Sequence, residues 1–306
     1  MSFETQSDTP PPADISTAEA PKPIAPTAPG AFLTRLLRAA PTKPGQTYGV
    51  PGEGRTVGIS IAAVAVVLLV WQAVNMAGLV APLFLPSPVQ VVEKFIAILN
   101  TGYTGAPLWL HVLVSAGRVF AAFTLACLIG IPLGLAMGMN PVMRGLFDPF
   151  LEFYRPIPPL AYLPLMIIWF GIGETSKVLL IFLAVLAPVT LGARAGVRSV
   201  AIEQIHAAYS LGATRAQVLR EVVMHAALPE ILTSLRIGVG FGWTTLVAAE
   251  MVASTQGLGY MVLSASQFLQ TSTVLVGIIL IGAIAWIFDL AMRALERRIV
   301  PWKGRM

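Results

Sequence analysis

Charged residues are scarce in this chain of 306 residues. Asp, Glu, Lys and Arg together make up 11% of the sequence, whereas apolar residues make up 56% and the mean hydropathy is +0.77. A typical soluble domain carries about 25% charged residues. The composition therefore excludes an ordinary soluble domain and indicates an integral membrane protein.

Cysteine and histidine are also rare. The single cysteine, Cys127, lies inside an apolar run, so it forms no intrachain disulfide and is expected to be a small packing residue. The three histidines are His111, His206 and His225, and no cysteine or carboxylate accompanies them at ligand spacing. We expect no metal site.

Motifs for nucleotide binding and catalysis are missing. The chain has no GxxxxGK[ST] sequence, so it has no P-loop and any use of ATP requires a partner. Gly238, Gly240 and Gly242 have a nucleotide-like spacing, but Trp243 follows and no strand precedes, which favours helix packing. No nucleophile, base and orienting group occur together, so the chain is not expected to be an enzyme.

Residues 1–54 are rich in proline and have little to bury. They hold ten of the 24 prolines, which predicts a disordered tail. Residues 1–30 carry acidic side chains and no apolar core, so they do not resemble a signal peptide. Residues 31–40, AFLTRLLRAA, form either a basic amphipathic helix at the inner leaflet or a transient helix, and both alternatives stay open.

Residues 55–306 are predicted to form an all-α domain with six membrane spans. A helix needs about 20 apolar residues to cross a bilayer. The expected spans are 57–76, 112–137, a proline-interrupted third span within 147–173, then 178–192, 231–252 and 273–292. Two short segments, 89–99 and 254–272, are expected on the outer surface, the second also as a possible re-entrant segment.

The basic residues test this topology. Of 20 Lys and Arg residues, 17 fall on or near the side that would be cytoplasmic, and Lys94, Arg118 and Lys177 are the exceptions. Because cytoplasmic loops are enriched in Lys and Arg, this distribution places both termini in the cytoplasm. It also explains the net charge of +5 without a nucleic-acid partner.

The third span is interrupted by prolines. Pro156, Pro158 and Pro159 break the helix at membrane depth, with Pro164 close behind. Irregular backbone persists there only where protein or a water-filled cavity satisfies its polar groups. The three prolines are therefore candidates for lining a transport pathway, and a kinked structural helix is the alternative.

Four ionisable residues lie within or near the spans: Arg118, Arg236, Glu250 and Asp289. An unpaired charge at a span's centre costs about 2.5–3.5 kcal/mol, so such groups lie near an end or find a partner. Arg236 and Asp289 are close enough to helix ends to reach the interface. Glu250 ends a span before the glycine-rich QGLGY segment, which makes Glu250, Gly257 and Gly259 candidates for a gate, with structural anchoring as the alternative.

The polar stretch 197–229 separates two apolar segments and is expected to be cytoplasmic. Residues 202–211 predict a helix that ends at Gly212, since glycine readily adopts positive φ. Thr214 and Gln217 predict a capping box that begins a second helix. Pro229 and Glu230 are expected in the first turn of span five.

The second helix of this stretch is predicted to have two faces. Val218 with Val222, and Leu219 with Val223, would stack at i,i+4, whereas the polar side chains would face water or a partner. These polar residues are Arg215, Gln217, Arg220 and Glu221. The alternative interpretation of the whole stretch 197–229 is an ordinary extramembrane loop.

The segment HAAYSLGATRAQVLREVVMH resembles the cytoplasmic loop of bacterial ABC importer permeases. That loop carries EAA, three residues, Gly, nine residues, and I-x-L-P. Ala207, Ala208 and Gly212 match at the correct spacing, and Val222 stands for the Ile. The departures are His206 in place of Glu, and Met224 with His225 in place of Leu-Pro.

Other segments are similar to the taurine, sulfonate and nitrate group of these permeases. They are 154–177, 229–255 and 257–262, and the resemblance covers about residues 56–303. It implies a type I ABC importer permease in the bacterial inner membrane. The implied substrate is taurine or a related alkanesulfonate, and the alternative substrates are nitrate, bicarbonate or an aromatic sulfonate. The alternative class of protein is a stand-alone channel or secondary transporter.

The resemblance also implies partners. The permease would dimerise with a second copy, dock one ATPase subunit per protomer, and receive substrate from an extracytoplasmic binding protein. The chain itself would bind no cofactor, because ATP and Mg would be held by the ATPase. The implied contact residues are His206, Ala207, Ala208, Gly212, Thr214, Arg215, Gln217 and Arg220.

Overall fold

The computed structural model describes residues 57–302, and the side chains of Val57 and Ala253 are outside the description. The predicted tail 1–54 and its helix 31–40 therefore lie outside the described residues. The chain divides into two compact units, one up to Leu69 and one from Val70 onward. All sites discussed below belong to the second unit.

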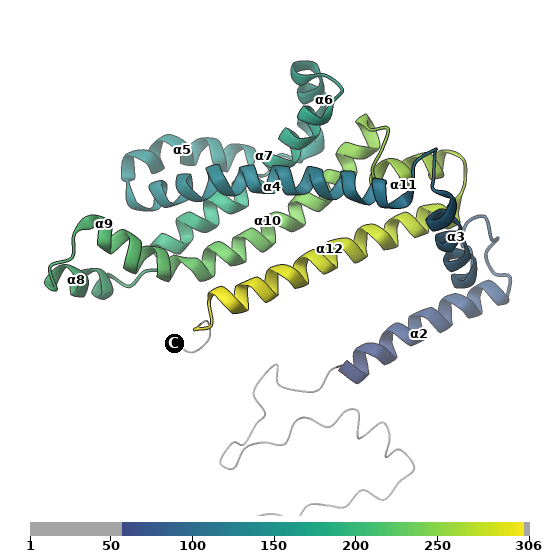
Figure 1. Cartoon of the computed structure of the whole chain (residues 1–306), viewed down its shortest axis with the longest axis horizontal. Coiled ribbons are helices and arrows are strands. Elements are labelled where there is room, and N and C mark those ends of the chain that lie inside the picture. The colour runs from purple at the N-terminus through teal and green to yellow at the C-terminus, as the bar shows by residue number, and fades with distance from the viewer. Residues whose placement is uncertain (1–56, 303–306) are drawn as a thin grey trace, which may run out of the picture. The chain divides into compact units, whose positions relative to one another are not determined.

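The described part of the chain is helical throughout, with no β-strand among residues 57–302 (Figure 1). The elements are α2 (Val57–Met76), α3 (Pro88–Thr101), α4 (Leu108–Met139), α5 (Pro141–Tyr154), α6 (Pro159–Phe170), α7 (Glu174–Arg198), α8 (Ile202–Ser210), α9 (Arg215–Gln217), the π-helix η1 (Val218–Val223), α10 (Met224–Ala253), α11 (Leu258–Gln267) and α12 (Thr271–Ile299).

Five helical stretches are long and apolar enough to cross a membrane. They are Gly58–Met76, Leu108–Met139, Glu174–Arg198, Arg215–Val252 and Thr271–Ile299. The expected third span consists instead of α5 and α6, separated by residues 155–158, and α6 turns away from the direction of α5 (Figure 1). Proline lacks an N–H and restricts the residue before it, so Pro156, Pro158 and Pro159 account for the break.

Helices α4, α7 and α10 form the core of the second unit. Val119 of α4, Val185 of α7 and Leu246 of α10 are among its fully or almost fully buried residues. A Cβ atom on Gly134 of α4 would lie 2.3 Å from the carbonyl oxygen of Thr190 on α7. The small residue therefore allows α4 and α7 to approach each other closely.

Glycines of α10 pack in the same way. Gly238 and Gly242 each face Val185, with 3.2 Å between its methyl groups and the Cβ that either glycine would carry. Helix packing is thus confirmed for these two residues. Gly240 has open space around its Cβ position.

Short helices gather at one end of the core. Val91 of α3, Leu258 and Met261 of α11, and Val276 of α12 form a second buried cluster. Figure 1 places α3 and α11 at one end of this unit and α8 and α9 at the other. We refer to these as the α11 end and the α8 end.

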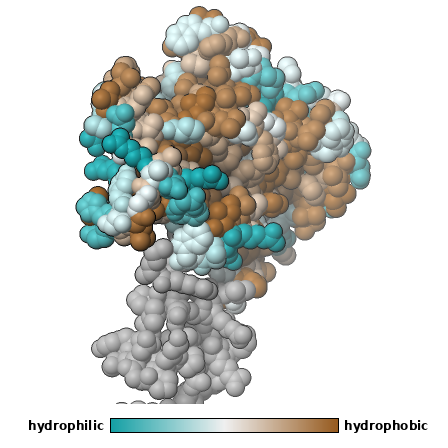
Figure 2. All heavy atoms as spheres, turned by 60° about the vertical axis from the view of Figure 1, so that its left-hand side comes forward, coloured by the Kyte–Doolittle hydropathy of each residue, from teal (hydrophilic) through white to brown (hydrophobic). Residues whose placement is uncertain are grey.

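Apolar side chains cover much of the outside. Ile168, Ile172 and Leu128 are 77%, 78% and 69% exposed, and Figure 2 shows apolar residues over much of the visible face. A soluble monomer rarely exposes such continuous apolar surface. The surface fits a lipid environment.

Two predicted boundaries were wrong. Helix α10 begins at Met224 and continues the helical path from Arg215, so Pro229 lies inside a helix and not in its first turn. Residues 224–228 before Pro229 already belong to α10, which continues the path of η1, so no helix starts at Pro229. Helix α7 begins at Glu174, before the expected start of the fourth span at residue 178, and the turn before it is made by residues 171–173, with Gly171 at φ +77°.

Candidate functional site

The first candidate site is the loop element at the α8 end. Helix α8 ends before Gly212, which has φ +84°, and the N–H of Gly212 donates to the carbonyl of Tyr209 at 2.9 Å. The N–H of Ala213 donates to the carbonyl of Ala208 at 3.1 Å. The predicted glycine-terminated helix is confirmed.

The predicted capping box is also present. The N–H of Thr214 donates to Gln217 Oε1 at 2.8 Å, and the N–H of Gln217 donates to Thr214 Oγ1 at 3.4 Å. These bonds satisfy two donors at the start of the long helix. The element is therefore one short helix, a glycine break and a capped helix that leads directly into α10.

The second helix of the loop element has the two faces that the sequence predicts, although part of it is the π-helix η1. Val218 and Val223, five residues apart, are 4% and 6% exposed. Leu219 and Val222 are half-buried, whereas Arg215, Gln217, Arg220 and Glu221 are exposed. The predicted apolar and polar faces of this helix are therefore confirmed, although its hydrogen bonds run from i to i+5 in η1.

The outer face of the loop element is exposed. His206, Ala207, Gly212, Thr214, Arg215, Gln217 and Arg220 are exposed, and Ala208 is half-buried. A shallow groove of about 350 Å³ is lined by Ala208, Leu211, Gly212, Ala213, Gln217, Val218, Glu221 and Val222. Leu211 is 89% exposed, and sequence reasoning missed it because the motif does not specify that position.

The second candidate site is a cavity of about 500 Å³ where the third span is broken. Pro156, Pro158 and Pro159 line it, together with residues of α7 and α10. The predicted pathway prolines therefore do border a cavity in one place. Their role in transport stays a prediction.

The cavity wall combines apolar and polar groups. Arg155 at the α5–α6 break and Glu230 on α10 are exposed within its lining, and Tyr162 and Ser234 add hydroxyl groups. The hydroxyl of Tyr154 donates to the carbonyl of Leu183 at 3.3 Å. Apolar walls with a few polar groups are typical of small-molecule sites.

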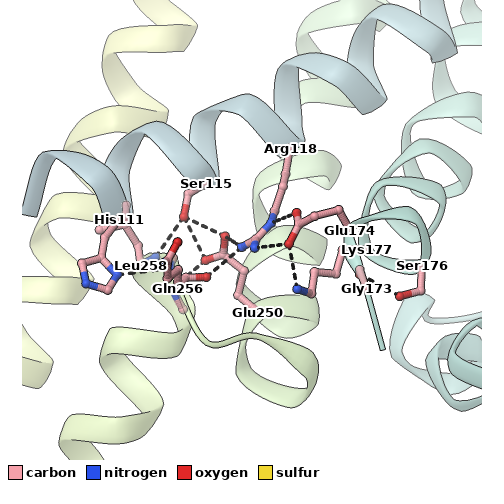
Figure 3. A network of polar contacts seen from close by, with 12 residues as sticks. His111, Ser115, Arg118, Gly173, Glu174, Ser176, Lys177, Glu250, Gln256 and Leu258 are labelled. Carbon is pink, nitrogen blue, oxygen red and sulfur yellow. Dashed lines mark hydrogen bonds and ion pairs between the residues drawn. The ribbon is translucent and has the colours of Figure 1, made fainter. Parts of the chain in front are cut away.

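The third candidate site is a buried polar network at the α11 end (Figure 3). Glu250 of α10 is 0% exposed, and its Oε1 lies 2.6 Å from Nη1 of Arg118 on α4. Ser115 Oγ lies 2.7 and 2.9 Å from the two carboxylate oxygens. The N–H of Gly259 donates to Glu250 Oε2 at 2.8 Å. Glu250 is therefore paired with a charge and hydrogen-bonded, as a buried carboxylate must be.

The glycine-rich segment is fitted around this carboxylate. Gly257 has φ +126°, and a Cβ there would lie 2.4 Å from the carboxyl carbon of Glu250. A Cβ on Gly259 would lie 2.7 Å from the carbonyl oxygen of Val247. The structure thus brings together the three residues predicted as gate candidates, Glu250, Gly257 and Gly259.

Two residues of α4 hold the backbone of that segment. The N–H of Gly257 donates to Nδ1 of His111 at 3.1 Å, and the N–H of Leu258 donates to Ser115 Oγ at 2.9 Å. His111 Nε2 lies 3.2 Å from the carbonyl oxygen of Tyr103, so Nε2 carries the proton. Both side chains are fully buried.

Arg118 also bridges to a second carboxylate. Its Nε and Nη2 donate to the two oxygens of Glu174 on α7, each at 2.6 Å, and its Nη1 donates to the carbonyl of Gln256 at 2.9 Å. Lys177 Nζ donates to Glu174 Oε1 at 3.0 Å. The network therefore joins α4, α7, α10 and the segment before α11.

Sequence reasoning singled out Arg118 and Glu250 separately, but it did not pair them and did not predict that Glu174 and Lys177 join them. One signal was available: Arg118 and Lys177 were two of the three cations outside the cytoplasmic majority. A Lys or Arg side chain on the less basic side of a membrane protein is expected to have a carboxylate partner nearby.

The other charged pair within the spans lies between α10 and α12. Arg236 Nε is 2.9 Å from Asp289 Oδ1, and Asp289 also accepts from Arg293 Nε at 2.7 Å. Arg236 and Asp289, which were expected to reach the interface, thus contact each other. Within residues 57–302, no group of three or more His, Cys, Asp or Glu residues is placed to hold a metal ion.

Comparison with known proteins identifies relatives over most of the chain. The chain is 56% identical over 253 residues to the taurine transport system permease protein TauC of Escherichia coli, covering 82% of this chain and 92% of that protein. It is 35% identical over 240 residues to the aliphatic sulfonates transport permease protein SsuC of Bacillus subtilis. This match covers 78% of this chain and 86% of that protein.

A solved structure and a family description agree on the fold. A structure titled as inward-facing conformations of the MetNI methionine ABC transporter matches with a TM-score of 0.56 at 17% identity, covering 63% of this chain and 97% of that chain. Residues 130–301 match the family described as "Binding-protein-dependent transport system inner membrane component". The chain belongs to this family of ABC transporter permeases.

Proposed function

We propose that this permease imports taurine or a related alkanesulfonate, driven by a separate ATPase. The observation that carries the substrate class is the 56% identity to a taurine transport permease over 82% of the chain. The cavity supports it, because Arg155, Glu230 and hydroxyl groups line one space. A cation, a carboxylate and hydroxyls suit a small zwitterion that carries a sulfonate and an ammonium group.

The loop element at the α8 end is the proposed docking site for the ATPase. Its support is the exposed Leu211 next to a groove that includes Gly212 and Gln217. A partner that occupies this groove would remove the apolar surface of Leu211 from water, which favours the contact. The ATPase would hold ATP and Mg, and this chain would bind no cofactor and hydrolyse no ATP.

The remaining parts of the assembly follow from the same proposal. Two copies of the chain pair in the inner membrane, each with six spans and cytoplasmic termini, and a binding protein delivers substrate at the α11 end. ATP binding draws the two loop elements together. Because the helical path from Arg215 to Val252 is continuous, this motion reaches the Glu250 network.

Reconstitution tests the function. Proteoliposomes that contain the chain, its ATPase and its binding protein should take up labelled taurine only when ATP is present on the side where the ATPase is bound. Unlabelled alkanesulfonates should reduce this uptake more than nitrate does. Liposomes with the chain alone should show no uptake. Uptake by the chain alone would indicate a channel or secondary transporter, and ATP-driven uptake of nitrate in preference to sulfonates would overturn the substrate.

A further inference from the structure

We propose that Arg118 and Lys177 form an anion site at the α11 end, in which the carboxylate of Glu174 is a tethered substitute for a sulfonate group (Figure 3). The identity of the anion rests on the proposed function. The existence of the site rests on the geometry of three side chains.

The cationic part of the site is built into the core. The side chains of Arg118 and Lys177 are each only 5% exposed, and they approach the Glu174 carboxylate from two helices. The carboxylate also lies at the N-terminus of the 25-residue helix α7, where backbone dipoles favour negative charge. Three sources of positive potential thus converge on one carboxylate.

The two carboxylates of the network differ in how firmly they are held. Glu250 is 0% exposed and bound by Ser115 and the Gly259 N–H as well as Arg118. The Glu174 side chain is 61% exposed, and among the described residues its side-chain partners are Arg118 and Lys177. Glu174 can therefore turn into water by a side-chain rotation, whereas Glu250 cannot.

The geometry of the contact suits an oxyanion of another molecule. Nε and Nη2 of Arg118 each donate to a different oxygen at 2.6 Å, which is the two-point contact that guanidinium makes with carboxylates and related oxyanions. A sulfonate presents three oxygens, so two could occupy this fork while the third accepts from Lys177.

Charge balance selects the sign of the ligand. Arg118 and Lys177 are balanced by Glu250 and Glu174 in this structure. When Glu174 turns away, the site keeps one net positive charge, which a monoanion neutralises and an ammonium ion does not. The bound anion would contact the guanidinium that also holds Glu250 and the Gln256 carbonyl.

Binding of sodium methanesulfonate to the full-length chain in lipid nanodiscs tests this site, measured by calorimetry against sodium chloride at equal concentration. Glu174→Gln removes the competing charge, so it should bind methanesulfonate at least about tenfold more tightly than the wild type. Adding Lys177→Met to this variant should abolish the gain. Glu93→Gln, which removes an exposed carboxylate with no contact to Arg118, should behave as the wild type.

The outcomes separate the two proposals. Equal methanesulfonate affinity in the wild type and Glu174→Gln, or binding that Lys177→Met leaves unchanged, would overturn the anion site. If Glu174→Gln does not fold, Glu174→Asp, which withdraws the carboxylate by one methylene, should bind with intermediate affinity. Binding without ATP-driven sulfonate uptake would refute the import proposal alone, and uptake without binding would refute the site alone.

Discussion

At the scale of single residues, the glycine at position 257 is constrained both by its positive φ and by its contact with Glu250. Gly257→Ala would place a methyl group 2.4 Å from the Glu250 carboxyl carbon at φ +126°, where only glycine is unstrained. We expect a loss of about 2–4 kcal/mol in the free energy of unfolding, seen as a lower Tm in nanodiscs.

Gly240→Ala is the matched control for this change. It lies inside α10, has no atom within 4 Å of its Cβ position and has ordinary helical backbone. Since alanine is favoured over glycine in helices by roughly 0.5–1 kcal/mol, stability should stay equal or rise. A Gly257→Ala variant as stable as Gly240→Ala would contradict the constraint.

The buried Arg118–Glu250 pair makes a second residue-scale prediction. Arg118→Met leaves a fully buried carboxylate without its charged partner, so we expect a loss of about 3–5 kcal/mol. The double variant Arg118→Met, Glu250→Gln removes both charges and should recover most of that loss. Additive losses in this cycle, measured by thermal unfolding, would show that the two side chains act independently.

Elements differ in how much of them the sequence reveals. Spans such as 57–76 were predictable because hydropathy and length are local properties, and the Gly212 break and Thr214 cap were predictable because they depend on neighbours within three residues. The π-helix was not predictable, since a shift of hydrogen bonding by one residue has no residue signature. Pro229 was misplaced because proline is typical of the first turn of a helix, whereas here the helix already runs through η1 into α10 before it.

Contacts between elements were beyond sequence reasoning. Arg118 and Glu250 are 132 positions apart, and nothing local specifies that pairing. The sequence could indicate only that a charged side chain within a span requires a partner. Glu250 became identifiable as the partner of Arg118 only from the packing of α4 against α10.

The loop element carries its own prediction. Leu211→Asp places a charge on the most exposed apolar side chain beside the docking groove, so ATPase affinity should fall by at least about tenfold while membrane insertion stays normal. Gln204→Asp, on α8 but outside the groove lining, is the control. Unchanged co-purification of the ATPase with Leu211→Asp would argue against docking at this groove.

At the scale of the whole molecule, one helical path connects the two ends. The stretch Arg215–Val252 has 38 residues, which at about 1.5 Å per residue spans roughly 57 Å. It begins at the capping box of the loop element and ends beside Glu250. Because a continuous helix resists compression and bending, displacement of the loop should move the polar network at the other end.

Softening this helix without changing its length tests that connection. Glu221→Gly with Met224→Gly lowers helix propensity by about 1 kcal/mol per residue, at the junction of η1 and α10. We expect ATP hydrolysis by the assembled complex to persist while substrate imported per ATP falls severalfold. Glu221→Ala with Met224→Ala removes the same side chains but preserves helix propensity, so it should retain coupling. Equal transport per ATP in both double variants would show that rigidity of this segment does not carry the motion, and that the α8 end acts on the α11 end through the packing of α4 and α7.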